Sequence, residues 1–583
     1  MPEFSFQKKE GKTMEPIIDP RGIQVRRKLK LAPRTTLEEL KKGPILFYDN
    51  TKLRYAGYRE VYLKLKRNLE KLGVTNIIYV EETVRGKESI ELEEFGKELV
   101  KRYKPKAAIV ALGDMGTAPA TALVAIGIEK AGVPTVYLTA PPGHDVTRAY
   151  VFYRAGQLPL CPLDIYQGST REEIDAEVDK KMNLILTFLT GDADTITRLA
   201  TVDFRYDVTP PSEDGLITLG DKINVNEKLL TEEPAAYLEE IMDLFHKLGI
   251  GDGLPMIPPT RRRYERMLEY CPWNPDEVII HDVGPAGVDI TVKDIIVAAI
   301  MAGAKPQAVP ILITAFRAMG DKRYNFFQSV HTSHPGGNLI LISGPLAKEI
   351  GLYGGQGCLG PGPWQNAAIG RAVNLVLINR LRVIPGASDL ACISSQAEFT
   401  YCFAEEPELS PWPTINEERY DKETTTVLVL KAEPPHDIID FISQTASDLM
   451  DTIVDCCTTL GSNNAYLPSS LVLVLTPDHA KLLAKDGWNK DMIREYIHTW
   501  ARIPTPMVRN RGLSPARPKE FEDMHPMPVT RSPKDIEVVV AGGRGGHSAV
   551  ILPWGLHSEA IVKPVLLPNG EVAKSIEDFK RVK

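Results

Sequence analysis

The chain has 583 residues, of which 43% are hydrophobic and 25% charged, the composition of an ordinary globular protein. This length exceeds what a single hydrophobic core supports and predicts about three to four domain-sized units. The formal net charge is -7, from 69 basic and 76 acidic residues, which argues against nucleic acid as a partner of the chain as a whole.

The N-terminal residues 1–40 are polar and basic and contain no apolar signal-peptide core, so we expect a flexible arm there. No run of about 18 uncharged apolar residues occurs in the chain, so no membrane span or membrane partner is expected. The seven cysteines show no CxxC spacing, which is typical of reduced thiols and predicts a cytoplasmic protein.

Residues 41–205 alternate short apolar strands with amphipathic helices, which predicts a Rossmann-like, doubly wound parallel sheet. The strands are expected at Pro44–Tyr48, Asn76–Val80, Ala107–Leu112 and Thr135–Leu138, and the helices at Tyr58–Leu72, Leu92–Tyr103 and Ala118–Ala131. Ligands of such sheets bind beyond the carboxyl ends of the strands. This rule brings three turns to one rim: Asp49–Lys52, which includes Thr51, then Gly113–Thr117, and Thr139–His144.

The turn Gly113–Thr117 is the first candidate site. It joins a buried strand to a helix, and the free amides of Gly113, Gly116 and Thr117 suit an anion. Lys52 is placed to contact the same anion, and Asp114 is a candidate acid or base. A plain strand-to-helix turn without a ligand is the alternative.

The segment Gly113-Asp114-Met115-Gly116-Thr117-Ala118 also carries a resemblance. With Asp49-Asn50-Thr51-Lys52 before it and Gly132-Val133-Pro134-Thr135 after it, it resembles the UGSC family of selenoproteins and their cysteine homologues over residues 44–150. That family is named for a Gly-Asp-Sec-Gly-Ser-Cys motif on a Rossmann-like module. Here Met115 stands at the selenocysteine or cysteine position and Ala118 at the second cysteine. Because a thioether forms no thiolate, the redox function presumed for the family does not carry over.

The remaining chain divides into a linker, residues 206–240, rich in Pro, Asp, Glu and Gly, and a larger α/β or α+β module of two lobes, residues 241–583. Strands are expected at Leu339–Ser343, Thr425–Leu430, Leu471–Leu475 and Ile536–Ala541, and helices at Ala235–Leu248, Thr291–Ala302, Gln307–Met319, Gln365–Ile378 and Pro477–Ala484. This part contains the segments Asp252–Thr260, Ser343-Gly344-Pro345, Asn366–Ala372 and Glu405–Trp412. Through these segments much of residues 240–560 resembles a module that often accompanies UGSC-type domains, but this resemblance implies no mechanism.

The second candidate site is the run from His331 to Gly337 in the larger module. His331 and His334 are candidate general acids or bases. Their HxxH spacing also allows a metal site, with Glu405, Glu406 or His547 as a distant third ligand. A histidine that merely holds the loop through a carbonyl is the alternative, and Gly336 and Gly337 are expected to let substrate approach the backbone.

A third candidate is the loop Gly354–Gly362 with the helix that follows it. Gly355 and Gly357, together with Asn366 and Arg371 on that helix, suit a carboxylate or phosphate. The loop matches GxGxxG but does not follow a strand directly, and no acidic residue lies about 20 positions later, so a dinucleotide is not expected. Cys358 is either a nucleophile or a small apolar filler.

The last candidate is the run from Gly542 to Ser548, which follows a strand. Arg544 is expected to bind an anion and His547 to donate a proton. Asp114 or Glu405, from other parts of the chain, is expected to be the acid/base partner of the histidine. The chain lacks GxxxxGK[ST], GxSxG, HExxH and paired CxxC motifs, which disfavours P-loop kinases, α/β-hydrolases, zincins and zinc ribbons.

Together these patterns predict an enzyme that acts on a small organic anion, a carboxylate, by acid/base chemistry of the lyase, hydratase or isomerase type. The site is expected at a glycine-rich loop near the junction of the two modules. A thiol oxidoreductase using Cys358 and a non-catalytic binding or scaffold protein are the alternatives. Cofactors are left open, and a homo-oligomer is expected from base rates alone.

Overall fold

The computed structural model describes residues 16–24, 26–55, 57–114, 116–141, 143–204, 210–217, 234–521, 524–555 and 558–581. Met115, residues 1–15 of the expected arm and most of the expected linker 206–240 lie outside these ranges. Described residues of the arm are packed rather than free: Ile17 and Leu29 are buried, and β1 (Ile17–Ile18) pairs with β7 (Leu216–Ile217).

The N-terminal module is a five-stranded parallel sheet with strand order β3-β2-β4-β5-β6, which confirms the predicted doubly wound architecture. The strands are β2 (Ile45–Asp49), β3 (Ile77–Glu81), β4 (Ala107–Gly113), β5 (Thr135–Thr139) and β6 (Leu160–Pro162). One face packs on α2 (Arg59–Lys71) and α6 (Arg171–Thr190), and the other on α3 (Ser89–Tyr103), α4 (Ala118–Lys130) and α5 (Gly143–Arg154). Because helices cover both faces, every residue of β2 and β4 is buried, which explains their uninterrupted apolar runs.

The strand order reverses between β2 and β4. The chain leaves β2 toward β3 on one side of the sheet, whereas β4 continues on the other side. The connections that follow β2 and β4 therefore diverge and leave a crevice beyond the carboxyl ends of these two strands, where open α/β sheets bind their ligands.

Helices α3 and α4 approach so closely that glycines are required at their crossing. A Cβ atom at Gly127 would lie 2.1 Å from the carbonyl oxygen of Glu93, and one at Gly96 would lie 2.3 Å from the carbonyl oxygen of Val124. Backbone atoms of the neighbouring helix form these contacts, so a side chain could fit only if the helices moved apart.

We therefore expect Gly127→Ala to destabilise the protein by about 1–3 kcal/mol, the usual cost of overpacking, despite the higher helix propensity of alanine. Urea denaturation followed by circular dichroism measures the change. Gly461→Ala is the matched control, because a Cβ there meets no atom within 4 Å. Equal stability of Gly127→Ala and wild type would contradict the close crossing.

The larger module places two four-stranded sheets face to face. The first has the order β11-β10-β12-β19 and the second β13-β18-β14-β17. Their bounds are β10 (Gly337–Ser343), β11 (Cys402–Ala404), β12 (Thr426–Ala432), β13 (His436–Ile439), β14 (Leu471–Leu475), β17 (Ile536–Val540), β18 (His547–Ile551) and β19 (Ile561–Pro564). In β10, Leu339 and Leu341 face the other sheet, whereas Ile340 and Ile342 face the helices.

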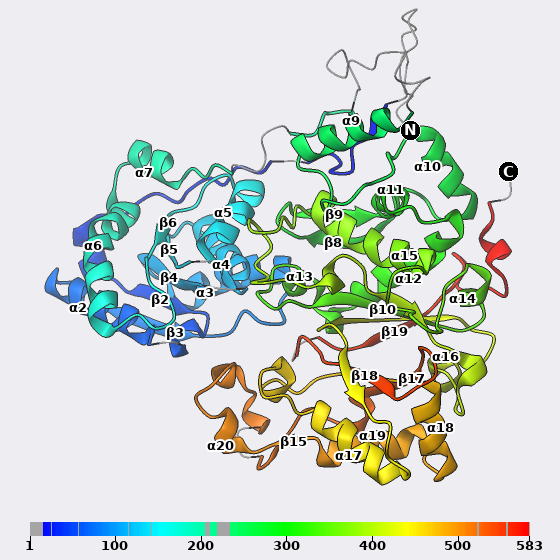
Figure 1. Ribbon diagram of the computed structural model, residues 1–583. Coiled ribbons are helices and arrows are strands. Elements are labelled where there is room, and N and C mark those ends of the chain that lie inside the picture. The colour runs from blue at the N-terminus through cyan, green and yellow to red at the C-terminus, as the bar shows by residue number, and fades with distance from the viewer. Residues whose placement is uncertain are drawn as a thin grey trace, which may run out of the picture.

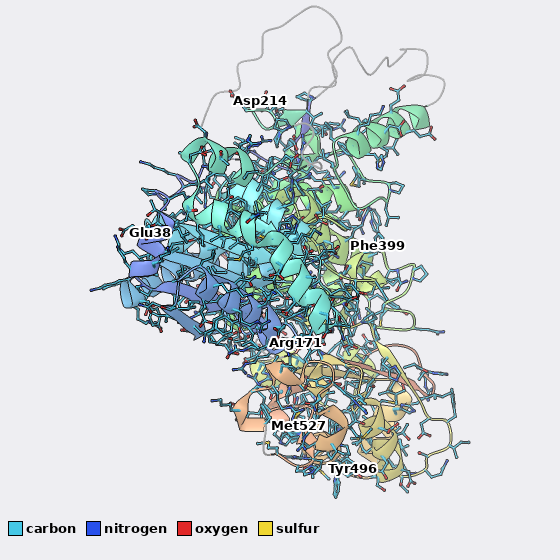
Figure 2. The ribbon with its side chains drawn as sticks, turned by 90° about the vertical axis from the view of Figure 1, so that its left-hand side faces the viewer. Glu38, Arg171, Asp214, Phe399, Tyr496 and Met527 are labelled. Carbon is cyan, nitrogen blue, oxygen red and sulfur yellow. The ribbon has the colours of Figure 1, made fainter. Side chains whose placement is uncertain are left out.

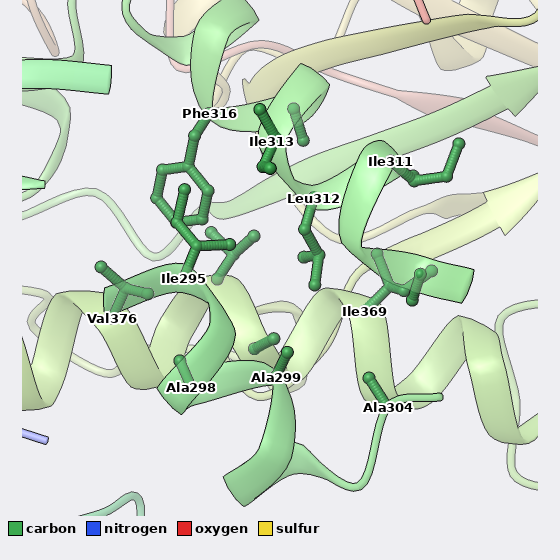
Figure 3. Close-up of a cluster of buried hydrophobic side chains, with 14 of the residues drawn as sticks. Ile295, Ala298, Ala299, Ala304, Ile311, Leu312, Ile313, Phe316, Ile369 and Val376 are labelled. Carbon is green, nitrogen blue, oxygen red and sulfur yellow. The ribbon is translucent and has the colours of Figure 1, made fainter. Parts of the chain in front are cut away.

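Helices cover the outer face of each sheet, so the module has four layers, helix–sheet–sheet–helix (Figure 1). The first sheet packs on α12 (Val309–Met319) and α15 (Trp364–Leu375), and α11 (Val292–Ala302) packs on these two helices; we call this part the middle lobe. Figure 3 shows its core, where Ile295 of α11, Leu312 of α12 and Ile369 of α15 point toward one another. The second sheet packs on α17 (Ala446–Cys456), α18 (Pro477–Lys485) and α19 (Lys490–Trp500) and forms the C-terminal lobe.

The middle lobe contacts the N-terminal module through polar groups that are buried or partly buried. Arg154 on α5 reaches Asp282 on β8 (Val278–Val283), with Nη1 3.1 Å from Oδ1, and its guanidinium also donates to the carbonyl of Gly284. The Gln328 amide donates to the carbonyl of Val84 at 2.9 Å. No helix in the described ranges is long and apolar enough to cross a membrane.

Candidate functional site

A cavity of about 430 Å³ lies where the N-terminal module, the middle lobe and the C-terminal lobe meet; we call it the junction cavity. The N-terminal module contributes Lys52, Arg85, Gly116 and Thr117 to its wall. The loop before β10 contributes Thr332–Pro335, and Glu433 follows β12. Asn463, Leu467, Leu513 and Trp554 close the far side.

The N-terminal wall of the junction cavity is the carboxyl rim of β2, β3 and β4. Lys52 follows β2, Arg85 follows β3, and Gly116 follows β4. The turn after β2 is held by Asp49, whose Oδ1 accepts from the backbone amide of Lys52 at 2.9 Å. The rule that ligands bind beyond the strands of such sheets thus leads to this wall.

Lys52 and Asp114 form a buried ion pair at the point where the strand order reverses. Their Nζ and Oδ1 atoms are 3.2 Å apart, and both side chains are at least 95% buried. Neither oxygen of Asp114 accepts a hydrogen bond within the described part of the chain. A buried carboxylate normally has such partners, so Asp114 keeps acceptor capacity behind the cavity wall.

The turn after β4 touches the loop before β10 directly. A Cβ atom at Gly116 would lie 3.3 Å from Cα of Thr332, so glycine lets the two modules meet. Behind it, Nδ2 of Asn50 donates to the hydroxyls of Thr117 and Thr121 and ties this turn to β2. The predicted residue Thr51 adopts a left-handed conformation, with φ 70°, and turns the chain toward Lys52.

His334 and Glu433 form the polar wall of the middle lobe. Nε2 of His334 lies 3.3 Å from Oε1 of Glu433, which also accepts from the hydroxyl of Ser462 at 2.7 Å. Oε2 of Glu433 has no hydrogen-bond partner among the described residues. Glycine at 336 leaves room for the imidazole, because a Cβ there would lie 2.8 Å from Nδ1 of His334.

His331 lies in the contact between the modules, away from His334. It is fully buried, its Nδ1 is 2.8 Å from the hydroxyl of Tyr150, and its ring packs edge-on against Phe327. Burial, reinforced by the charge of Arg154, lowers the pKa of His331 to about 3. The predicted acid/base role gains no support here, because His331 is not in the wall of the junction cavity.

The low pKa of His331 makes the stability of the module contact depend on pH. The folded pKa of about 3 lies below the unfolded value of about 6.5. Above about pH 6.5 the free energy of unfolding is therefore independent of the protonation of His331. As the pH drops from 6.5 toward 3, this free energy falls by up to about 1.4 kcal/mol per pH unit. We expect His331→Gln to flatten this part of a plot of Tm against pH. Parallel curves for the variant and wild type would contradict the assignment.

The loop Gly354–Gly362 lies at the opposite end of the middle-lobe sheet. A Cβ at Gly354 would touch the carbonyls of Ala404 and Glu405, at the carboxyl end of β11, whereas His334 precedes the amino end of the parallel strand β10. Strand β10 therefore separates this loop from the His331–Gly337 loop, so the two loops do not serve one cavity. None of the predicted residues Gly355, Gly357, Cys358 and Asn366 is in the wall of the junction cavity.

Local contacts account for the polar residues of this loop and its helix. The amide of Asn366 binds the carbonyls of Tyr353 and Cys358. Arg371 pairs with Asp252, with Nε 2.7 Å from Oδ2, and donates to the carbonyl of Pro255. Both were predicted to bind substrate, yet they hold neighbouring loops in place.

Burial raises the pKa of the Cys358 thiol to about 11. The thiolate that nucleophilic or exchange chemistry requires is therefore scarce at neutral pH. This favours the apolar-filler interpretation of Cys358, whose side chain belongs to the core between the two sheets.

The run Gly542–Ser548 lies with Gly354–Gly362, away from the junction cavity. The amide of Gly542 donates to the carbonyl of Gly354 at 2.7 Å. Arg544 pairs with Asp478 and His547 with Asp437, both at the surface. The predicted anion clamp and proton donor therefore bind acidic side chains of this chain.

The structure also separates the proposed metal ligands. Glu405 is buried and accepts from Ser343 and from the amide of Ile415, and burial raises its pKa. His547 is on the second sheet. Across the described ranges, no three His, Cys, Asp or Glu side chains are grouped so that they could hold a metal ion.

Glycines 113 and 337 have packing roles that explain their identity. A Cβ at Gly113 would lie 2.4 Å from the hydroxyl of Tyr137, and one at Gly337 would lie 2.2 Å from the carbonyl oxygen of Ala397. These glycines position the loops that bear Asp114 and His334, and neither is in the wall of the junction cavity.

Sequence reasoning missed Arg85, Glu433 and Trp554. Arg85 follows the strand predicted at Asn76–Val80, so the carboxyl-end rule would have identified it. Glu433 follows the strand predicted at Thr425–Leu430 and precedes Pro434-Pro435, a weak signal of a loop. Trp554 carries no signal, because its contact, a hydrogen bond from Nε1 to the hydroxyl of Thr332 at 2.9 Å, joins distant parts of the chain.

Comparison with known proteins finds no matching family, no matching curated protein and no matching solved structure.

Proposed function

We propose that this protein is an enzyme that binds a small organic anion, a carboxylate, in the junction cavity and catalyses proton transfer at a carbon atom of that substrate. This is acid/base chemistry of the lyase, hydratase or isomerase type. Two observations carry the proposal. Arg85 and Glu433 line the same cavity, and in the part of the chain described Arg85 has no carboxylate partner and Glu433 has one unpaired oxygen.

Arg85 supports anion binding. The guanidinium is half-buried, and its one described polar contact is a hydrogen bond from Nη2 to the hydroxyl of Tyr55 at 3.2 Å. It therefore keeps donors for a carboxylate, which guanidinium binds in a bidentate manner. Lys52 lies in the same wall, but Asp114 already balances its charge.

Glu433 supports proton transfer. Ser462 and His334 hold Oε1, so Oε2 is the oxygen that is free to accept a proton. His334 shares a hydrogen bond with the carboxylate and acts as its positioning residue and proton partner. A carboxylate fixed in this way is a suitable general base for a C–H group beside the carboxylate of a substrate.

Binding of small carboxylates tests the first half of the proposal. Succinate, malate and 3-hydroxybutyrate are screened by thermal shift and calorimetry, and we expect at least one of them to bind. Its affinity should fall about 10- to 100-fold in Arg85→Gln, because the variant loses a charge-assisted hydrogen bond. Arg54→Gln is the matched control, because Arg54 follows the same rim but pairs with Glu81 at the surface. Equal loss in both variants, or in neither, would contradict a site at Arg85.

A further inference from the structure

A second, smaller cavity of about 170 Å³ lies within the middle lobe; we call it the lysine cavity. Its wall includes Asn338 of β10, Lys431 of β12, Asn374 of α15 and the loop that contains Asp389 and Glu398. Phe399 is part of the wall and is 43% exposed, so the cavity borders the surface (Figure 2). This cavity has no part in the function proposed above.

Lys431 is deeply buried, and its amine is unpaired. Only 5% of the residue is exposed, and among the described residues its Nζ has no hydrogen-bond or ion-pair partner. Two other described lysines are equally buried, and each has a carboxylate: Lys52 pairs with Asp114, and Lys490 with Glu418 at 3.0 Å. Burying a lysine ammonium group without a partner costs several kcal/mol, so buried lysines are normally paired with a carboxylate. Lys431 departs from this rule.

The position of Lys431 follows from the register of the sheet. It lies directly opposite Asn338 in the antiparallel pair β10–β12. The Asn338 amide is in turn fixed, since its Oδ1 accepts from the hydroxyl of Tyr324 at 2.6 Å. Lys431 therefore reaches the cavity from a rigid strand rather than from a mobile loop, as a precise reactive group requires.

Besides Asp252, which pairs with Arg371, two carboxyl groups share the cavity with this amine. Oδ1 of Asp389 accepts from the backbone amide of Ala391 at 3.0 Å, and Glu398 accepts from the hydroxyl of Ser394. Burial raises the pKa of both carboxyls and lowers that of Lys431, although their charges partly restore the latter. These shifts act in the same direction: they favour a neutral amine beside a protonated acid.

We propose that Lys431 is a nucleophilic amine that binds a small, neutral aldehyde or ketone in the lysine cavity as a protonated imine. The nitrogen lone pair adds to the carbonyl carbon, and the proton that leaves nitrogen goes to the carbonyl oxygen. Glu398 or Asp389 then gives a proton to this hydroxyl, the C–O bond breaks and water leaves. The positive imine and the new carboxylate balance each other, so no oxidant or reductant is consumed.

The cavity also indicates which carbonyl compounds fit. Its volume is below that of sites for drug-sized ligands, so it suits a molecule of a few heavy atoms. Leu377 and Val383 form apolar wall, and in this wall Lys431 is the one cationic side chain, against three acidic ones, of which Asp252 pairs with Arg371. The carboxylate of Glu398 or Asp389 already balances the charge of the imine, so a carboxylate on the ligand would find no further cation in this wall. Neutral ketones are therefore favoured over 2-oxo acids.

Reductive trapping tests this proposal on the full-length protein. The protein is treated with acetone and sodium cyanoborohydride near neutral pH, and peptide mapping locates the N-isopropyl groups. Lys431 should be labelled at least about tenfold faster than Lys490, which is equally buried but paired. Trapping should persist at pH values where surface lysines no longer react. An unmodified Lys431, or one modified no faster than surface lysines, would overturn the proposal.

Two variants and a second probe separate the parts of the mechanism. Lys431→Met should abolish the label, and Glu398→Gln should slow labelling while leaving Lys431 intact, so the proposal stays testable even where the first variant folds poorly. Pyruvate should label Lys431 more slowly than acetone. Faster labelling by pyruvate would overturn the assignment to neutral carbonyl compounds.

Discussion

Replacing Glu433 by Gln is expected to slow proton exchange between a bound carboxylate and solvent by about 10²- to 10⁴-fold, the usual contribution of a positioned general base. Glutamine has nearly the same shape, but its side-chain amide does not accept a proton as the carboxylate of glutamate does. The measurement is loss of the C–H signal of the ligand in D₂O, followed by proton NMR, and it requires no knowledge of the complete reaction.

Three further variants make this result specific. His334→Gln removes the proton partner and should lower the exchange rate by a similar order, whereas Ser462→Ala removes one positioning hydrogen bond and should have a smaller effect. Glu408→Gln is the matched control, because Glu408 is exposed and pairs with Lys348. Undiminished exchange in Glu433→Gln would exclude Glu433 as the base.

The second large effect is expected at the contact between the modules. Asp282→Ala should destabilise the protein by about 3–5 kcal/mol, since it leaves the guanidinium of Arg154, 1% exposed, without its carboxylate. Burial alone would raise the pKa of Asp282, but the charge and hydrogen bonds of Arg154 outweigh it, and the pKa is lowered. The carboxylate is therefore charged at neutral pH, and the pair is intact.

Thermal and urea unfolding measure this change. Glu98→Gln, which breaks the exposed pair with Arg102, is the control and should leave the stability nearly unchanged. Because the pair joins two modules, Asp282→Ala should also split the unfolding into two transitions. A single unshifted transition would show that Arg154 and Asp282 contribute nothing to the contact.

Much of the fold could be predicted because the local signals agree with the tertiary structure. The apolar runs at Ala107–Leu112 and Leu471–Leu475 are buried strands β4 and β14, and the helix predicted at Pro477–Ala484 is α18. The face-to-face packing of two sheets could not be predicted in this way. It depends on which face of β10 meets β14, and no local pattern encodes that choice.

The candidate site was predictable where a topological rule applies and not elsewhere. Lys52, Gly116 and Thr117 follow from parallel strands whose carboxyl ends share one rim. In the larger module, β12 runs antiparallel to β10, so composition alone does not tell which end of the sheet a loop occupies. The glycine-rich loops Gly354–Gly362 and Gly542–Ser548 were accordingly candidates although they lie away from the junction cavity, and Glu433, which lines that cavity, lay in no motif.

The threonine at position 332 is part of the wall of both the junction cavity and the lysine cavity. Its hydroxyl accepts from the indole of Trp554 and from the backbone amide of His334, and these two hydrogen bonds fix its orientation. A ligand that turns this side chain in one cavity would reshape the wall of the other. The affinities of two such ligands would then be linked, and by thermodynamic reciprocity each would alter the other by the same factor.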